Sequence, residues 1–251
     1  MVRQLIAGMP GFFQFSLAEI ANEAQRSYDL GLQAVLLFGI PREKDEQATS
    51  AYARNGIVPQ AVRAIKACCP ELVVITDVCL CECMSHGHCG VTRMDGEHFH
   101  VLYDESVELR AETALSHAAA GADLVTPSDM MDGRIGAIRE TLDANGFDQT
   151  RIVRYAAKFA SAFHGCFATR RKIPRSSATA IRIRWTVRIL KRRCAKSRSI
   201  STKARDIVLV KHCPVSTFSG ECASIAAKGG ADNSASPEGR AERAICVEAQ
   251  Q

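Results

Sequence analysis

Leu72–Val78 has the sequence LVVITDV, and it is followed at once by the cysteine-rich stretch CLCECMSHGHCG at residues 79–90. A continuous apolar run of this length is typical of a parallel strand that is buried on both faces. Ala34–Ile40 (AVLLFGI) has the same character. Each run therefore predicts a buried strand, and the reactive side chains stand where the strand at Leu72–Val78 ends.

Segments with the helical spacing of apolar residues alternate with such strand-like runs. Helices are expected over Leu17–Leu30, Ile57–Cys68, Glu105–Ala120 and Gly133–Ala144, and further strands over Ala122–Pro127, Arg151–Ala156 and Asp206–Val210. This alternation predicts an α/β fold with parallel strands. A doubly wound sheet would usually carry a Gly-rich phosphate loop, and the sequence has none. Reactive residues at strand ends are also where a (β/α)8 barrel builds its active site.

The composition is that of a soluble globular protein, with 47% hydrophobic and 24% charged residues among 251. The longest apolar runs are too short for a transmembrane helix, and the first residues lack the pattern of a signal peptide. Eleven cysteines in such a chain favour reduced thiols or metal ligands over disulfides. The expectation is a cytoplasmic enzyme with no membrane partner.

Four cysteines and two histidines fall within residues 79–89. Soft thiolates at short spacing are the ligands that zinc prefers. Cys79 and Cys81 point the same way on an extended segment, and Cys89 can fold back to them as a third ligand. Three ligands would leave a position open for water or substrate. Cys83 is an alternative fourth ligand, His86 and His88 are expected in the turn or beside the ligands, and inert thiols are the other interpretation.

Two lysines stand at the ends of strand-like runs. Lys158 follows the run at Arg151–Ala156, and Lys211 ends DIVLVK. A surface lysine is the simpler interpretation of each. A desolvated lysine, however, has a lowered pKa, and its neutral amine can attack a carbonyl to form a Schiff base. Ser128 likewise ends a strand, before residues that either cap the next helix or line the same site.

Six stretches of the chain resemble the porphobilinogen synthase (5-aminolevulinate dehydratase) family. They are MPGFFQFSL at 9–17, AVLLFGIPREKDE at 34–46, DVCLCECMSHGHCG at 77–90, PSDMMDGRIGAIRE at 127–140, YAAKFASAF at 155–163 and DIVLVK at 206–211. The resemblance runs without a break over residues 9–167, and the combination of motifs is highly specific.

The resemblance implies a fold, an activity and a set of site residues. The family fold is a (β/α)8 barrel, and its oligomeric enzymes condense two molecules of 5-aminolevulinate into porphobilinogen, a precursor of haem. Seven side chains inherit a role from the resemblance: Cys79, Cys81 and Cys89 as ligands of a catalytic zinc, Lys158 and Lys211 as Schiff-base lysines, and Asp77 and Ser128 as substrate contacts.

The chain departs from the family after Phe163. His164 and Ala168 replace a Tyr and an Arg, and residues 168–205 hold 14 Lys and Arg with no Asp or Glu. Residues 177–180 and 184–186 can be encoded so that the frame one nucleotide earlier gives Phe-Gly-Asp-Arg and Gln-Met-Asp, which belong to the family's active-site lid. We therefore interpret this basic segment as a lid read out of frame, poorly packed because its like charges repel, rather than as a nucleic-acid arm.

These departures predict an incomplete barrel in three parts. They are a partial barrel with the zinc loop at 1–167, the out-of-frame lid at 168–205, and a remnant strand with the second lysine and a degenerate tail at 206–251. The family's N-terminal arm and first strand are expected to be absent before Met9. Beyond Lys211, a second frame slip at 215–220 is preferred to a deletion that aligns 218–223 with the family's VSGEYA. Weak or absent activity is expected, and the alternative is a non-catalytic zinc-binding remnant whose basic segment contacts nucleic acid.

Overall fold

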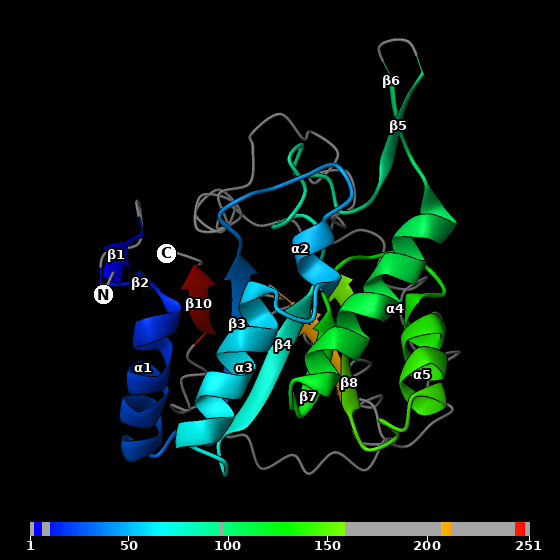
Figure 1. Cartoon of the computed structure of the whole chain (residues 1–251). Coiled ribbons are helices and arrows are strands. Elements are labelled where there is room, and N and C mark those ends of the chain that lie inside the picture. Colours follow the sequence, from blue (N-terminus) through cyan, green and yellow to red (C-terminus); the bar gives the residue numbers. More distant parts are fainter. Residues whose placement is uncertain (1–2, 7–10, 96–97, 159–206, 212–243, 249–251) are drawn as a thin grey trace, which may run out of the picture.

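The computed structural model of the chain describes residues 3–6, 11–95, 98–158, 207–211 and 244–248 (Figure 1). The expectations for the basic segment 168–205, for His164 and for the stretch 212–243 lie outside these residues. The helices are α1 (Leu17–Asp29), α2 (Thr49–Tyr52), α3 (Ile57–Cys68), α4 (Tyr103–Ala119) and α5 (Arg134–Ala144). The strands are β1 (Arg3–Leu5), β2 (Phe13–Phe15), β3 (Ala34–Ile40), β4 (Val73–Val78), β5 (Thr92–Asp95), β6 (His98–Val101), β7 (Leu124–Pro127), β8 (Arg151–Lys158), β9 (Ile207–Lys211) and β10 (Ala244–Glu248).

Eight strands form one sheet in the order β1-β2-β10-β3-β4-β7-β8-β9, and β5 and β6 form a separate hairpin. All neighbours in the sheet are parallel except β1 and β2. From β3 to β9, each strand of the sheet lies beside its predecessor in the chain. A doubly wound sheet would reverse this order at a switch point, so the winding is that of a (β/α)8 barrel. Over the residues that the structure describes, the sheet is open, with β1 and β9 at its edges.

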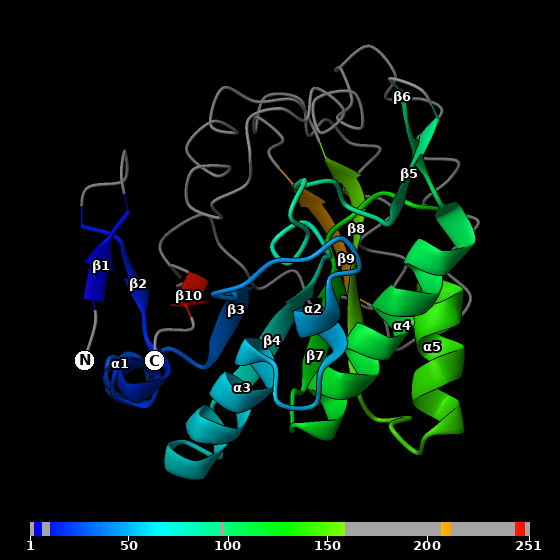
Figure 2. The ribbon, with the colours of Figure 1, turned by 45° about the horizontal axis from the view of Figure 1, so that its top comes forward.

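The helices form a single layer on one face of the sheet (Figures 1 and 2). Within this layer α1 packs against α3, α3 against α4, and α4 against α5. Two apolar clusters lie between helices and strands. One contains Ile20, Leu37, Val62, Ile65 and Val74, and the other contains Ala114, Val125, Ile138, Leu142 and Ile152, all at 0% exposure. Burying an aliphatic side chain of this size stabilises the fold by about 1.5–3 kcal/mol, so these clusters account for much of the free energy that packs the helices on the sheet.

The predicted elements agree closely with those observed where burial is strongest. The strand at Ala34–Ile40 and the helix at Ile57–Cys68 have the predicted limits. Gly31 and Gly121 follow α1 and α4 with φ of 83° and 103°, a conformation that ends a helix and favours glycine. No helix in the described part of the chain is both long enough and apolar enough to span a membrane.

Candidate active site and metal centre

The carboxyl ends of the parallel strands meet at one edge of the sheet, and the predicted site residues gather there. Asp77 lies in β4, Ser128 directly follows β7, and Lys158 and Lys211 are the last residues of β8 and β9. The register between β4 and β7 pairs Asp77 with Thr126 and Val78 with Pro127. Because these strands are neighbours in the sheet, residues as far apart in the chain as Asp77 and Lys211, which are 134 positions apart, come to one edge.

A β-bulge sets the position of Lys158. The pairing of β8 with β9 runs from Tyr155↔Leu209 to Ala157↔Val210 and Lys158↔Lys211, with a register shift after Tyr155. Counted from Tyr155, a regular ladder would place Ala157 opposite Lys211. The extra residue on β8 therefore makes the backbones of the two lysines direct neighbours, on strands spaced about 4.8 Å apart.

Asp77 and Ser128 are joined by a hydrogen bond at the same edge. The Ser128 hydroxyl donates to Asp77 Oδ2 at 3.2 Å. Both residues are buried, with exposures of 7% and 2%. A buried carboxylate that faces a site of this kind can hold a substrate ammonium, and the hydroxyl keeps it oriented before substrate arrives.

Three thiols converge in the loop that follows β4. Cys79 Sγ lies 3.1 Å from Cys81 Sγ and 3.8 Å from Cys89 Sγ. All three sulfur atoms lie within 4.8 Å of one another. Tetrahedral zinc with Zn–S bonds of about 2.3 Å separates its sulfur ligands by about 3.8 Å. The donor set and its spacing therefore fit a thiolate-bound metal ion, and the backbone has already brought the ligands together.

The surroundings of Cys81 favour its protonated form. Hydrogen bonds to Cys79 and Cys89, together with burial, raise the pKa of Cys81 well above its ordinary value. The Cys81 thiol donates to Glu82 Oε2 at 3.1 Å. A bound cation would replace these protons, because only thiolates ligate metals strongly.

The two histidines of the loop organise its turn. The His88 backbone N–H donates to His86 Nδ1 at 3.1 Å, which leaves the His86 proton on Nε2, 3.3 Å from Thr92 Oγ1. Burial lowers the pKa of both imidazoles. Neither histidine belongs to the possible metal-binding groups of the described residues, and both stay interpreted as residues of the turn or beside the ligands.

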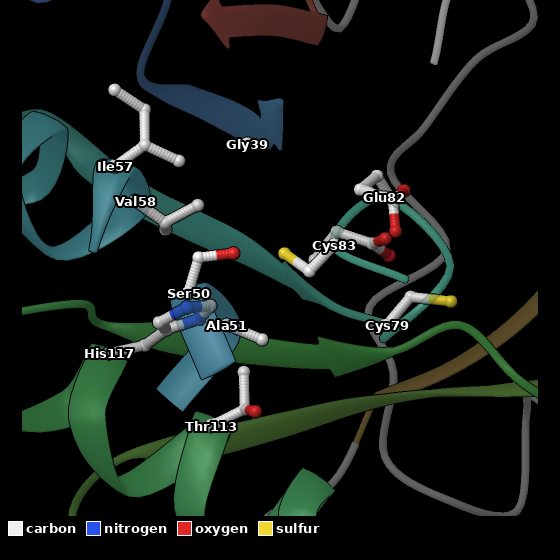
Figure 3. A pocket seen from close by; sticks show the side chains of 11 residues that line it. Gly39, Ser50, Ala51, Ile57, Val58, Cys79, Glu82, Cys83, Thr113 and His117 are labelled. Carbon is white, nitrogen blue, oxygen red and sulfur yellow. The ribbon is translucent and has the colours of Figure 1, made fainter. Parts of the chain in front are cut away.

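Cys83 belongs to a different environment. Its sulfur points into a small cavity toward Ser50, whereas the Cys79 sulfur points away from that cavity (Figure 3). Burial raises the pKa of Cys83 to about 12. Among the described residues, the groups that could hold a metal ion are Cys79 with Cys81 and Cys89, and Asp77 with Cys79 and Glu82. The structure thus gives no support to Cys83 as a fourth ligand.

Sequence reasoning missed a buried charge cluster next to Ser128. Asp129 Oδ2 lies 3.0 Å from Arg110 Nε and 3.5 Å from Arg134 Nε. Asp129 and Arg134 lie in the family motif at residues 127–140, but the motif does not indicate that their side chains are buried. Arg110 lies in an ordinary helical segment whose weak apolar pattern does not indicate that this side chain turns inward.

Known proteins resemble this chain over most of its length. A family model described as delta-aminolevulinic acid dehydratase matches residues 1–213. Proteins of that name from Synechococcus elongatus and Methanothermobacter thermautotrophicus are 47% and 51% identical over 166 and 164 residues. These alignments cover 66% and 65% of this chain but 51% and 49% of the relatives. The chain therefore spans about half the length of the curated relatives that it matches.

A solved structure extends this likeness to the fold. The crystal structure of delta-aminolevulinic acid dehydratase (porphobilinogen synthase) from Toxoplasma gondii ME49, in complex with the reaction product porphobilinogen, matches with a TM-score of 0.79 and 28% identity. The match covers 91% of this chain and 63% of that one. The fold is accordingly α/β of the (β/α)8 type, as the sequence predicted, with an open sheet in the described residues. The chain belongs to the delta-aminolevulinic acid dehydratase family.

Proposed function

We propose that this chain carries the chemistry of a porphobilinogen synthase, a lyase that condenses two molecules of 5-aminolevulinate. The observation that carries the proposal is the register partnership of Lys158 and Lys211 at the sheet edge that also holds Asp77 and Ser128. Two lysines at paired backbone positions suit a reaction that activates two ketones. The relatives' printed names supply the substrate class.

The lysines would each form an imine with one substrate molecule. The neutral amine nitrogen of Lys158 or Lys211 bonds to the ketone carbon of 5-aminolevulinate, and the ketone oxygen leaves as water. The resulting imine, once protonated on nitrogen, is a better electrophile than the ketone, and loss of a proton from the adjacent carbon converts it into an enamine, a carbon nucleophile. Two imines held at one edge can therefore supply both partners of a condensation without diffusion.

Asp77 and Ser128 would bind the amino group of one substrate. The Asp77 carboxylate offers a buried negative charge, and Ser128 already donates a hydrogen bond to its Oδ2. A substrate ammonium that replaces or joins this contact would have its carbon skeleton directed toward the strand ends. Proton transfer to and from that amine then falls within reach of Asp77.

We propose zinc as the ion of the three-thiol group formed by Cys79, Cys81 and Cys89. Three soft ligands at this spacing suit zinc and leave a fourth position for a substrate oxygen. When bound, the ion would supply Lewis-acid polarisation of that oxygen. Reduced thiols of this kind also support a cytoplasmic location, and a homo-oligomer is proposed from the family alone.

Imine trapping tests the proposal without requiring full turnover. The chain is incubated with zinc and 5-aminolevulinate, reduced with borohydride, digested and mapped by mass spectrometry. The proposal expects reduced adducts on Lys158 and Lys211 and none on Lys66. Lys66 is a matched control because its ammonium is partly buried and bound to Asp123 at 2.7 Å, away from the strand ends. Adducts at Lys66 in equal yield, or none at the two predicted lysines, would mean that the chain is a metal-binding remnant.

A further inference from the structure

Arg110, Asp129 and Arg134 form a buried cluster of two guanidinium groups around one carboxylate. Their side chains are 0%, 2% and 8% exposed. Both Nε contacts to Asp129 Oδ2 have ion-pair distances without hydrogen-bond alignment. Burying three charges is costly, and an apolar cluster of similar volume would often be as stable. A specific geometrical role would therefore explain why charged side chains occupy this place.

The cluster holds the loop that carries Ser128. The carboxylate of Asp129, the next residue, accepts the Met131 backbone N–H at 2.8 Å. The Arg134 guanidinium donates to the Met131 carbonyl, and Arg110 Nη1 donates to the Ser106 carbonyl of α4 at 2.6 Å. The loop is thereby tied to itself, and the Arg110–Asp129 ion pair links it to α4, where the bond to Ser106 holds the Arg110 side chain.

The same cluster bridges a gap between two strands. The backbone pairing of β7 with β8 covers Leu124↔Arg151 and Val125↔Ile152, near the start of both strands. The pairing of β4 with β7 continues to Pro127, the last residue of β7. Beyond the β7–β8 ladder, Arg134 Nη2 donates to the Tyr155 carbonyl at 3.1 Å. This bond links the Ser128 loop to β8 three residues before Lys158, beyond the pair Val125↔Ile152.

We propose that Arg110, Asp129 and Arg134 are positioning residues, which set the distance between Ser128 on one strand end and Lys158 on the next. This inference rests on the proposed function, because it assumes that Ser128 and Lys158 act on the same substrate. The guanidinium of Arg134 joins the two strand ends, Asp129 fixes the loop between them, and Arg110 anchors that loop on α4.

The charges of the cluster determine which variants are informative. Asp129→Asn would leave two buried guanidinium groups without a counter-ion, so it is expected to impair folding. Arg134→Met removes the bond to Tyr155 and leaves the Arg110–Asp129 pair balanced. Arg110→Met removes the anchor on α4 and leaves the Arg134–Asp129 pair balanced. Arg26→Met is the matched control, because Arg26 is 63% exposed and forms an ion pair with Glu23 of the same helix, α1.

The test measures the 5-aminolevulinate concentration that gives half-maximal borohydride trapping at Lys158. A misplacement of about 1 Å can cost about 100-fold in an oriented reaction, so we expect an increase of about tenfold or more for Arg134→Met. Arg110→Met should also raise the half-maximal 5-aminolevulinate concentration, and Arg26→Met should leave that concentration unchanged. In the Ser128→Ala background, Arg134→Met should add little, because Arg134 is expected to act through the placement of the Ser128 hydroxyl, which Ser128→Ala has already removed. Independent effects that multiply in the double variant would overturn the proposal.

A second readout keeps this inference separate from the proposed function. If the unaltered chain traps no substrate, the proposed function fails, and amide exchange then tests the positioning geometry alone. Arg134→Met should speed exchange of the Met131 amide, which donates to Asp129, by about tenfold while exchange in α1 stays constant. Unchanged Met131 protection in both Arg110→Met and Arg134→Met would overturn the positioning role whatever the activity.

Discussion

Lys158 and Lys211 are direct backbone neighbours because β8 contains one more residue than β9 after the pair Tyr155↔Leu209. The bulge converts two lysines that are 53 positions apart in the chain into a pair at the ends of adjacent strands. Bulges are common next to active sites, where they re-aim side chains. Here the bulge pairs the two lysines on which the proposed two-imine mechanism depends.

The three-thiol group can be tested by removing two of its members. Cys79→Ser with Cys81→Ser should abolish zinc binding. The double variant keeps one thiol and replaces two by hydroxyls, which bind zinc poorly. Zinc content of the purified protein, measured by atomic absorption, is the readout. Cys83→Ser is the control, since that sulfur points toward Ser50, and it should retain one zinc per chain. Zinc retention in the double variant, or its loss in Cys83→Ser, contradicts the assignment.

Gly90 should tolerate no side chain. An added Cβ would lie 2.6 Å from Ser106 Oγ, 2.9 Å from Val101 Cγ1 and 3.1 Å from Met131 Cε. Gly90→Ala should cost about 1–3 kcal/mol of stability by overpacking and weaken zinc binding, because Cys89 is the preceding residue. Thermal unfolding and zinc titration measure the two effects.

Gly136→Ala in α5 is the matched glycine control. An added Cβ at Gly136 meets no atom within 4 Å. Alanine is the better helix former by about 1 kcal/mol, so this variant should be neutral or more stable. Equal destabilisation by the two substitutions would show that the crowding at Gly90 has no consequence.

His117 should make stability depend on pH. Burial lowers its pKa from 6.5 to about 3, and its Nδ1 lies 3.1 Å from Thr76 Oγ1. The native imidazole therefore stays neutral where the unfolded one takes up a proton. As the pH falls from about 6.5 toward about 3, this residue should lower the free energy of unfolding by up to about 1.4 kcal/mol per unit.

Substitution of His117 isolates this contribution. His117→Gln removes the titrating group and keeps an amide that can bond Thr76. Urea unfolding at about pH 7.5 and about pH 5 should show a smaller loss of stability on acidification for the variant than for the unaltered chain. Equal losses in the two proteins would assign the acid sensitivity to other groups.

Turnover by this chain should be small even if imines form. The resemblance places further substrate-binding side chains in the lid, and residues 168–205 do not carry the lid motifs in the present frame. Orientation of reactants can supply about 7–11 kcal/mol of barrier lowering, so its loss for one substrate is severe. Pyrrole formation should be compared between this chain and a version with the frame of 168–205 restored. Comparable rates would show that the lid sequence is dispensable.

The sequence was sufficient for the elements with the clearest apolar pattern. The strand Ala34–Ile40 and the helix Ile57–Cys68 have the predicted limits, because the residues that form the apolar pattern in the sequence are the ones that are buried in the fold. β1, β2, β5, β6 and β10 were not predicted. They are three to five residues long and exist through pairing with partners that no local pattern reveals.

The site divides in the same way. The three thiols and the strand-end lysines could be selected from residue type and spacing, and the resemblance added Asp77. The backbone pairing of Lys158 with Lys211 could not be predicted, because it depends on a bulge within β8. The burial of Arg110 could not be predicted either. A helical arginine is ordinarily exposed, and the packing of α4 against the Asp129 loop turns this one inward.

The most direct test of the two-imine account is the stoichiometry of borohydride-reduced adducts in lysine variants, with zinc and saturating 5-aminolevulinate. The account predicts up to two substrate-derived additions on the unaltered chain, one on Lys158→Ala or Lys211→Ala, and none on the double variant. The remaining addition in each single variant should map to the other lysine. Full labelling of the double variant would contradict the account, as would an unlabelled chain that retains its zinc and its fold.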